Sequence, residues 1–567
     1  MADNEVTEET LYKPAGPIKL TRRSFIMGSL LAVFLCAMNS YLTLSFGVIE
    51  EGPTIAALFF FAFFFWSQNA ITTTELVVVA TMGSAGGSLG FITNFYAAKA
   101  MTGTAYTFWE MTAFAIVTSL IGLVFVIPLR ELLVVRDKLP WPGSKATASV
   151  ISALVHESDK KQPLYLLFSI FVAGTYVLLN TDGGFGILPD GTEIGLFGLS
   201  AYGAAIYWSP FAIGGAYLMG FRTCVGFLVG GLTLLVMAPY LPEDYVAAPN
   251  RYVWPGIAFL VASGITVMIV NWRVISGSML SLFSRRAVGV VDTDRIISPA
   301  ALMVLAGSSL LLTIAFLTMN QGLGVGLILM LVVVGGFVQN VIATRAAAQT
   351  AFNPARVMGV LLQGLSALMG GASASANLTG AGFVAGSGAQ AGNLTGDLAY
   401  GRWYKVPSRW QFWTQFTTLI PCALVSAYVF KLIRETHVLA IDSESLAAPV
   451  AKIWATSALI FEGKVPMPAG ATTAMIVGAI AGVVWVLLEA NKKIEPYIPS
   501  SVGLGLGLVL PIGYDFAFFL GGVILWLVCR RGFRVSDMTL TTVAVGCIVA
   551  EGLGGVIKPI LKILHLI

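Results

Sequence analysis

Two glycine-rich stretches decide how this sequence is interpreted: GSAGGSLGFIT at residues 83–93 and GSGAQAGNLTG at residues 386–396. Each is followed by Phe-Trp and an apolar run, FWEMTAFAIVTSLIGLVFV from Phe108 and FWTQFTTLIPCALVSAYVF from Phe412. At membrane depth, irregular backbone survives only where it is buried in protein or lines a wet cavity. Glycine-interrupted segments in matching halves point to a transporter's substrate site. We therefore expect two broken elements that face a shared cavity.

The composition is that of a chain embedded in a lipid bilayer. Hydrophobic residues make up 57% of the sequence and charged residues 11%, whereas soluble proteins carry about a quarter charged residues. Apolar runs of about twenty residues, the length of one membrane-spanning helix, recur throughout. The sequence predicts an all-α polytopic membrane protein with about 14–16 transmembrane helices in two duplicated halves, with broken or re-entrant segments. The net charge of +4 is not a nucleic-acid-binding signature.

The sequence lacks the clusters of residues that most enzyme active sites need. The five cysteines form no CxxC pair and there are only three histidines, which disfavours a metal site. Phosphate chemistry needs clustered carboxylates or a glycine-rich loop ending in Lys-Ser/Thr, and neither occurs. We expect no enzyme activity, no cofactor and no bound metal. A chelated metal stays open as a substrate, because the chelator would supply the ligands.

The first half of the chain divides into eight candidate spans. Lysines and arginines gather after the even-numbered spans, and acids after the odd-numbered ones. Positive loops stay in the cytoplasm, so we expect a multi-pass protein of the cell membrane with a cytoplasmic N-terminus. Lys99 and Arg251 do not fit this rule. The candidate spans are residues 24–47, 53–71, 75–97, 106–129, 164–180, 201–220, 223–241 and 254–270.

The second half repeats motifs of the first in the same order. SQNAIT at residues 67–72 is echoed by VQNVIAT at 338–344, and LPWPGSKATA from Leu139 by VPMPAGATTA from Val465. Because the first half holds an even number of spans, the halves are expected to share one orientation; an inverted pair within each half stays open. The expected units are a cytoplasmic tail (1–23), a first membrane repeat (24–285), a linker (286–298) and a second membrane repeat (299–567).

Polar side chains inside spans are costly and mark functional sites by default. Gln68 and Asn69 precede the third span, and Glu75 opens it. We consider these residues for substrate binding and Glu75 for proton coupling. A carboxylate at this position also suits the N-terminus of a helix, where it interacts with the dipole.

The region around the second glycine-rich stretch carries the densest set of candidates. Asn377, Gln390 and Asn393 are expected to line a substrate site; close helix packing through small residues is the alternative explanation for the glycines. Asp397 is the strongest candidate for a proton carrier, because buried acids titrate upward towards neutral pH. A simple ion pair with Arg402 is the alternative.

Two further candidates lie elsewhere in the second half. Arg345, Gln349, Asn353 and Arg356 would fall near one face of a continuous helix, where the arginines could clamp an anionic substrate. The alternative is a cytoplasmic helix end whose arginines face lipid headgroups. Glu551, in IVAEGLGG, is a second possible proton site.

These stretches together resemble the oligopeptide transporter family. NSYLTL from Asn39 looks like the family's first-span Asn-x-Tyr-x-x-Leu element, which marks Asn39 and Tyr41 as substrate-binding candidates. LPWPGSKATASVISALV from Leu139 is similar to its Leu-Pro-Phe-Pro-Glu-Gly element, with Gly143 in place of the usual glutamate. The resemblance implies proton-driven secondary uptake of small peptides or metal chelates, about sixteen spans in related halves, and a homodimer. A passive channel or a transporter of another small organic solute remains the alternative.

Overall fold

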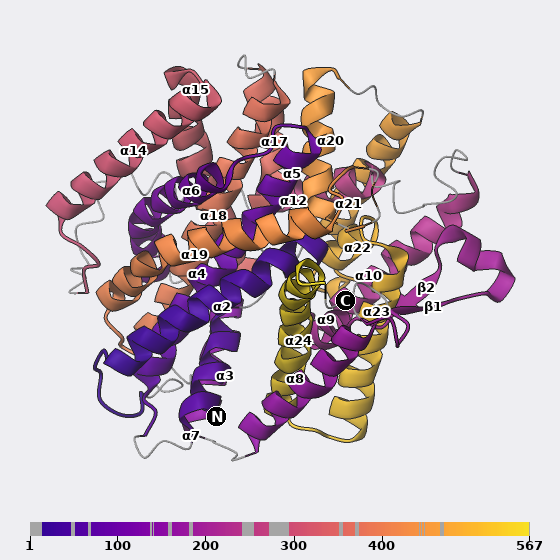
Figure 1. Cartoon of the computed structure of the whole chain (residues 1–567), viewed down its shortest axis with the longest axis horizontal. Helices are drawn as coiled ribbons and strands as arrows, with labels where there is room; N and C mark the ends of the chain where they lie inside the picture. Colours follow the sequence, from indigo (N-terminus) through magenta and orange to yellow (C-terminus); the bar gives the residue numbers. More distant parts are fainter. Residues whose placement is uncertain are drawn as a thin grey trace.

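The computed structural model shows a bundle of helices whose long members cross one another obliquely (Figure 1). It describes residues 14–46, 52–65, 70–136, 139, 141–156, 161–180, 185–240, 254–270, 294–350, 355–368, 373–441, 443, 445–446, 448–464 and 470–565. The α-helices of the first half are α2 (Arg22–Phe46), α3 (Gly52–Phe64), α4 (Thr73–Phe91), α5 (Thr93–Met101), α6 (Phe108–Leu129), α7 (Pro142–His156), α8 (Gln162–Leu179), α9 (Pro210–Met219), α10 (Phe221–Met237) and α12 (Trp254–Val270).

The second half continues the bundle with α14 (Pro299–Gln321), α15 (Val325–Met330), α16 (Asn340–Thr350), α17 (Ala355–Leu368), α18 (Ala374–Trp403), α19 (Ser408–Thr436), α20 (Pro449–Glu462), α21 (Ala471–Glu489), α22 (Ser501–Gly507), α23 (Ile512–Gly522) and α24 (Asp537–Ile563). Wider π-helical segments are η1 (Arg130–Arg136), η6 (Leu331–Gln339) and η8 (Val523–Gly532); 3-10 turns are η2 (Leu196–Tyr202), η3 (Ala238–Tyr240) and η7 (Glu495–Tyr497). The strands β1 (Gly191–Glu193) and β2 (Ala205–Tyr207) pair antiparallel.

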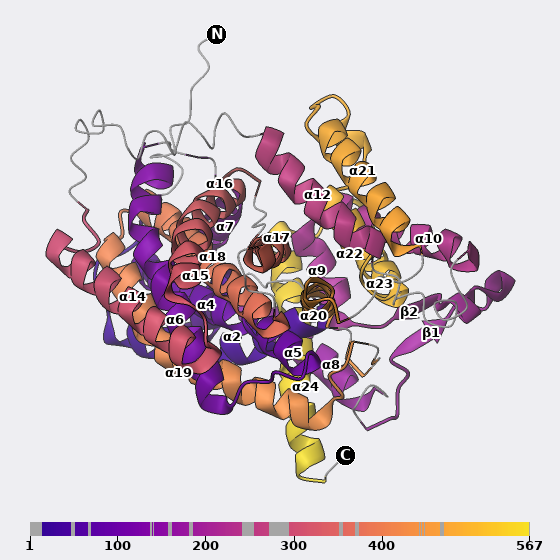
Figure 2. The same cartoon turned by 90° about the horizontal axis from the view of Figure 1, so that it is seen from above.

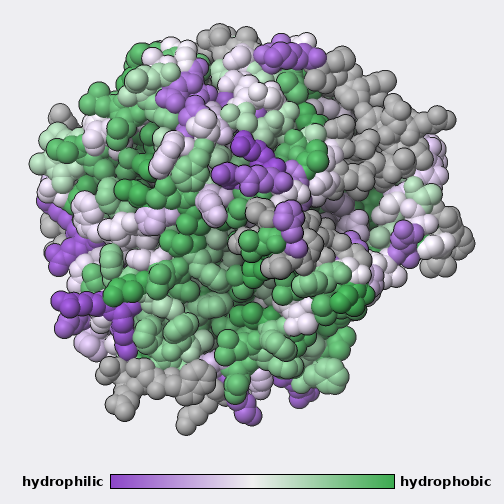
Figure 3. Space-filling model, viewed as in Figure 1, coloured by the Kyte–Doolittle hydropathy of each residue, from purple (hydrophilic) through white to green (hydrophobic). Residues whose placement is uncertain are grey.

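The described part of the chain contains ten helices that are long and apolar enough to cross a membrane, with three shorter apolar helices beside them. Large apolar side chains such as Phe171 on α8, Val304 on α14 and Ile480 on α21 are exposed, and hydrophobic residues cover much of the visible face (Figure 3). Exposed apolar residues outside and buried polar residues inside are what a lipid environment favours. The chain is an all-α polytopic membrane protein.

Most expected spans of the first half match the observed helices within a few residues, and 254–270 matches α12. The expected span 201–220 is wrong. Gly203 adopts a left-handed conformation that ends η2, β2 follows, and Ser209 caps a new helix, α9, at Pro210. The hairpin of β1 and β2 lies at one edge of the molecule (Figure 2). Residues 201–220 are mostly apolar, so their composition alone did not indicate the turns.

The glycine-rich stretches are helical, which corrects the expectation of broken elements. The second stretch, 386–396, lies inside the uninterrupted 30-residue helix α18, and the first lies in α4, which meets α5 at Ile92. Every residue of α4 is buried. A Cβ on Gly86 would lie 2.3 Å from the carbonyl oxygen of Ala32 on α2. The glycines therefore allow helix backbones to approach closely.

The helices α4 and α18 run antiparallel where they touch. Ser88 contacts Asn393, Thr81 contacts Tyr400, and Phe95 of α5 lies against Gly382. As residue numbers rise on one helix, they fall on the other. The shared orientation expected for the two halves therefore does not hold for this matching pair of elements.

The helices that follow them pack in a reciprocal way. On one side α6 runs parallel to α18, with Tyr106 beside Thr379 and Thr118 beside Gly386. On the other side α19 runs parallel to α4 and α5, with Gln411 bonded to Thr81 and the rings of Phe430 and Tyr96 only 5.6 Å apart. The segments 73–136 and 374–436 therefore contact each other in a reciprocal way.

Candidate functional site

A line of polar contacts joins α4, α18 and α19 inside the apolar bundle; we call it the polar seam. Asn393 Nδ2 donates to Ser88 Oγ at 2.9 Å, and the hydroxyls of Tyr400 and Thr81 are 3.3 Å apart. Gln411 Nε2 donates to Thr81 Oγ1 and to the Asp397 carbonyl oxygen, both at 2.8 Å. The residues Thr81, Ser84 and Ser88 on α4 and Asn393, Asp397 and Tyr400 on α18 are spaced three or four positions apart, which places each set on one face of its helix.

Asp397 lies in the middle of the polar seam with 3% of its surface exposed. Its side chain interacts with the hydroxyls of Ser84 and Tyr400, and its Oδ2 has no hydrogen-bond partner in the described part of the chain. The alternative ion pair with Arg402 is therefore not what the structure contains. An acid held by neutral hydroxyls can gain and lose a proton without breaking a salt bridge.

A second feature is a set of buried side-chain amides with unmet hydrogen bonds, which we call the orphan amides. Each is at most 2% exposed. Four have neither amide atom bonded within the described residues, while Gln363 bonds the Trp454 carbonyl and leaves its Oε1 unmet. Nearly all buried polar groups in proteins are satisfied, so each exception requires an explanation. We keep the name for the five on η6, α16, α17 and α18, which are Gln339, Asn340, Gln363, Asn377 and Gln390; Asn39 on α2 and Gln415 on α19 are also buried with both amide atoms unmet within the described residues.

The elements that carry the orphan amides pack together around α18. The segments η6, α16 and α17 all contact α18, and α17 also contacts η6. Gln339 and Asn340 mark the change from the π-helical η6 to α16, and such wide turns are frequent at functional sites. Gln390 lies against Gly122 of α6. Two of the predicted site residues, Asn377 and Gln390, therefore belong to this set.

The predicted arginine stripe extends over two described helices, and residues 351–354 between them lie outside the described part of the chain. Arg345 and Gln349 belong to α16, which ends at Thr350, and Arg356 belongs to α17. Arg345 is buried at 4% exposure. The side chains of Gln349 and Arg356, and all of Asn353, lie outside the described residues.

Glu75 has the structural role that was weighed as its alternative. With Thr72 it forms a capping box at the start of α4, and it accepts hydrogen bonds from Thr21 Oγ1 at 2.6 Å and Arg23 Nε at 2.5 Å. The carboxyl group is fully buried, whereas Arg23 is 22% exposed. Its three partner residues, Thr21, Arg23 and Thr72, account for its conformation without a substrate. Gln68 and Asn69 lie outside the described residues.

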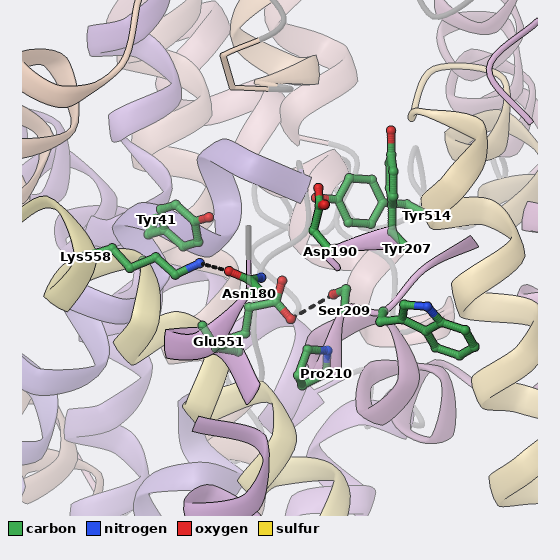
Figure 4. A pocket seen from close by; sticks show the side chains of 12 residues that line it. Tyr41, Asn180, Asp190, Tyr207, Ser209, Pro210, Tyr514, Glu551 and Lys558 are labelled. Atoms are coloured by element: carbon green, nitrogen blue, oxygen red, sulfur yellow. Dashed lines mark hydrogen bonds between the residues drawn. The ribbon is translucent and has the colours of Figure 1, made fainter. Parts of the chain in front are cut away.

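A pocket lies between α24, α8 and the segment that leads into α9, and Figure 4 shows its side chains. Glu551 Oε2 accepts from Ser209 Oγ at 2.8 Å and from the Phe211 amide at 2.7 Å. Lys558 Nζ donates to Asn180 Oδ1 at 2.9 Å. The rest of the lining consists of Tyr41, Val177, Asp190, Tyr207, Trp208, Pro210, Tyr514 and Gly555. This α24 pocket brings the predicted residues Tyr41 and Glu551 together.

The two site candidates of the first-span motif, Asn39 and Tyr41, lie in different surroundings. Asn39 lies against Gly90 of α4, and neither atom of its buried amide has a partner among the described residues. Tyr41 packs against Gly555 of α24 and lines the α24 pocket. Helix α2 therefore lies between the α4 side of the bundle and the pocket.

Sequence reasoning missed Gln339 and Asn340, although the signal was available. They are the Gln-Asn pair of VQNVIAT, which is similar in sequence to the segment that holds Gln68 and Asn69. The repeat supported a duplication, but only the first copy was considered for a site. Lys558 was also missed, because one lysine near the end of an apolar helix is typical of a snorkelling residue.

Comparisons with known proteins identify the family. The sequence profile described as "OPT oligopeptide transporter protein" matches residues 19–252 and 246–562. "Putative oligopeptide transporter YGL114W" of Saccharomyces cerevisiae is 22% identical, over 80% of this chain and 81% of its own. A Haemophilus influenzae protein named "Putative oligopeptide transporter" is 26% identical over 36% of this chain and 33% of its own.

A plant protein also matches, the "Probable metal-nicotianamine transporter YSL14" of Oryza sativa subsp. japonica. It is 25% identical over 39% of this chain and 34% of its own length. Because the family profile covers nearly the whole sequence, the chain belongs to the OPT oligopeptide transporter family.

Proposed function

We propose that this member of the OPT family is a secondary active transporter that imports small oligopeptides or peptide-like metal chelates, driven by protons and working by alternating access. The observation that carries the proposal is the set of orphan amides inside a membrane bundle whose family transports such solutes. The relatives' names supply the substrate classes.

The orphan amides have the chemistry needed to recognise a peptide or a chelate. Asn340 and Asn377 each offer one acceptor and two donors, which match the N–H and C=O groups of a peptide bond or the carboxylates of a chelator. A buried polar group without a partner costs about 1–3 kcal/mol. A substrate that meets these groups would recover that free energy on binding.

Asp397 is the proton carrier in this proposal. It is buried beside neutral hydroxyls, and one carboxyl oxygen is unmet in the described part of the chain. Glu551 is a secondary candidate, because the Ser209 hydroxyl and the Phe211 amide already satisfy one of its oxygens. Glu75 is the weakest candidate, since its ion pair with Arg23 and its cap hold it in place.

Alternating access would use the reciprocal packing of segments 73–136 and 374–436. Inverted repeats allow one bundle to rock against the other around a central site. The polar seam lies where α4 and α18 cross. Sliding of α4 along α18 would therefore change which side chains surround the Asp397 carboxyl group. Two membrane repeats, 24–285 and 299–567, joined by a linker at 286–298, remain the proposed organisation.

The test is uptake into proteoliposomes with an imposed pH gradient, with di- to pentapeptides and an iron or nickel chelate as substrates. Wild-type protein should accumulate at least one substrate above equilibrium, and a protonophore should abolish the accumulation. Asp397→Asn should lose gradient-driven uptake and keep exchange of substrate for substrate. Glu435→Gln, which changes an exposed acid at the end of α19, is the matched control and should behave as wild type.

The result also separates the alternatives. A passive channel equilibrates its solute and never accumulates it, whatever the pH gradient. A transporter of another small organic solute would show no flux with any peptide or chelate. If Asp397→Asn accumulates substrate normally, the proton assignment is wrong although the transport function stands.

The cellular setting is part of the proposal. We propose that the N-terminus lies in the cytoplasm and that the protein spans the cell membrane; the distribution of loop charges supports this orientation. The resemblance to the family points to a homodimer. The accessibility of a cysteine introduced as Lys19→Cys, an exposed position near the described N-terminal end, would report the side of the membrane. The mass of the detergent-solubilised complex would report the oligomeric state.

A further inference from the structure

A carboxylic acid outside every site described so far is completely buried on α23. Asp515 has no exposed surface, and neither of its oxygens has a hydrogen-bond partner in the described part of the chain. It lies in the first turn of a helix that belongs to a candidate membrane span. An acid at membrane depth is expensive and is retained where it has a function.

The close neighbour of the carboxyl group is the backbone of α10. A Cβ on Gly231 would lie 2.8 Å from Asp515 Oδ2 and 3.0 Å from its Cβ. The absence of a side chain at Gly231 therefore makes room for the acid. The same helix packs Gly230 against Gly507 of α22, so the acid is enclosed by tightly fitted helices and not by a loose loop.

No ionic partner compensates a charge at this position within the described residues. Arg222 is bonded to Glu489 and Glu495, Tyr217 to Asp537, and Arg530 to Asp537. An unpaired carboxylate in apolar surroundings is far less stable than the neutral acid. The titratable or charged groups on the elements packed against α23 are Arg222 and Cys224 of α10, Tyr217 of α9, Tyr207 of β2, and Cys529, Arg530 and Arg531 of η8.

The residue that precedes Asp515 lines the α24 pocket. Tyr514 precedes Asp515 and lines the α24 pocket together with Tyr207, with the two rings 4.8 Å apart. Gly513 packs directly on the Tyr207 ring. In Figure 4 these two tyrosines form one wall of the pocket, across from Lys558 and Glu551. Tyr514 and Gly513 thus place the first turn of α23, which carries Asp515, beside the pocket.

We infer that Asp515 is a proton-binding site that is occupied while α23 is packed on α10 and is emptied through the α24 pocket when that contact opens. The inference rests on the proposed proton-driven transport and assigns it a second carboxyl group besides Asp397. Protonation makes the buried acid neutral and lets α10 and α23 close. Release leaves a carboxylate that favours the open, hydrated arrangement.

The first test does not depend on transport. Dicyclohexylcarbodiimide is an apolar reagent that modifies protonated carboxyl groups in apolar surroundings. With the full-length protein at neutral pH, peptide mapping by mass spectrometry should find the adduct at Asp515 and not at the exposed, ion-paired Asp537. Labelling should fall as the pH is raised. A protein that is labelled elsewhere but never at Asp515 would overturn the inference.

The second test uses the proteoliposome assay. Asp515→Asn keeps the size of the side chain and cannot carry a proton, so it should lose pH-driven accumulation and retain substrate exchange with a flattened pH profile. Normal accumulation by Asp515→Asn would refute the inference while leaving the proposed function intact. If wild-type protein shows no pH-driven uptake, the proposed function fails, and labelling alone then decides whether Asp515 binds a proton. Poor expression of the variant would leave the wild-type labelling result decisive.

Discussion

The packing role of the glycines gives a quantitative prediction at Gly86, where α4 meets α2. A Cβ there would lie 2.3 Å from the Ala32 carbonyl oxygen and 2.9 Å from the Cys36 backbone nitrogen. Ordinary contact begins at 3.4 Å, so Gly86→Ala forces the helices about 1 Å apart. Neither obstacle is a flexible side chain that could move aside.

Overpacking of this kind typically costs about 1–3 kcal/mol, and we expect Gly86→Ala to lose that much stability because backbone atoms are the obstacle. The matched control is Gly307→Ala on α14, where a Cβ meets nothing within 4 Å; it should gain about 0.5–1 kcal/mol from the better helix propensity of alanine. Thermal unfolding of both variants in the same detergent measures the difference. Equal stability of the two variants would refute the packing account of the glycine-rich stretches.

Three further predictions follow from named contacts. Arg23→Met should lower the free energy of unfolding by less than the about 3–5 kcal/mol of a fully buried pair, because Arg23 is partly exposed and the buried Glu75 carboxylate loses its ionic partner. Adding Glu75→Gln should restore part of the lost stability in an unfolding assay, and no recovery would argue against the pair. Asn377→Leu should keep or raise the melting temperature, because it removes an amide with unmet hydrogen bonds. The same variant should weaken substrate uptake, and reduced stability with normal uptake would contradict a binding role. Ser88→Ala should slow gradient-driven uptake, because Asn393 loses the acceptor that ties α18 to α4, and unchanged uptake would show that this contact does not affect transport.

The fold could be predicted in part because membrane helices carry their own signal. Apolar runs gave α2, α8 and α12 to within a few residues, since a bilayer fixes the length of such a helix. The strand β2 could not be found this way, because it lies within the apolar run 201–220 that resembles a span.

The glycine-rich stretches show why local sequence was insufficient at the centre of the bundle. Glycine suits both an interrupted helix and a tightly packed one. The choice between them depends on partners such as Ala32 and Thr118, which lie far away in the sequence. The direction of α18 relative to α4 likewise depends on contacts that no single stretch contains.

The candidate site was predictable as a set of residue types and not as an arrangement. Asn377, Gln390, Asn393 and Asp397 are all buried or half-buried on α18, as the polar content of an apolar segment suggested. Asp515 escaped notice because one acid in YDFAFF has no repeat or motif around it. Only its complete burial against α10 distinguishes it.

The most direct test of the account is to locate a transported substrate in the protein. A cryo-electron microscopy map of the full chain with a peptide or chelate that it accumulates should show density within hydrogen-bond distance of Asn340, Asn377 or another orphan amide around α18. Substrate bound only at the lipid-facing surface or beyond the helices around α18, with the orphan amides still unoccupied, would contradict the central claim.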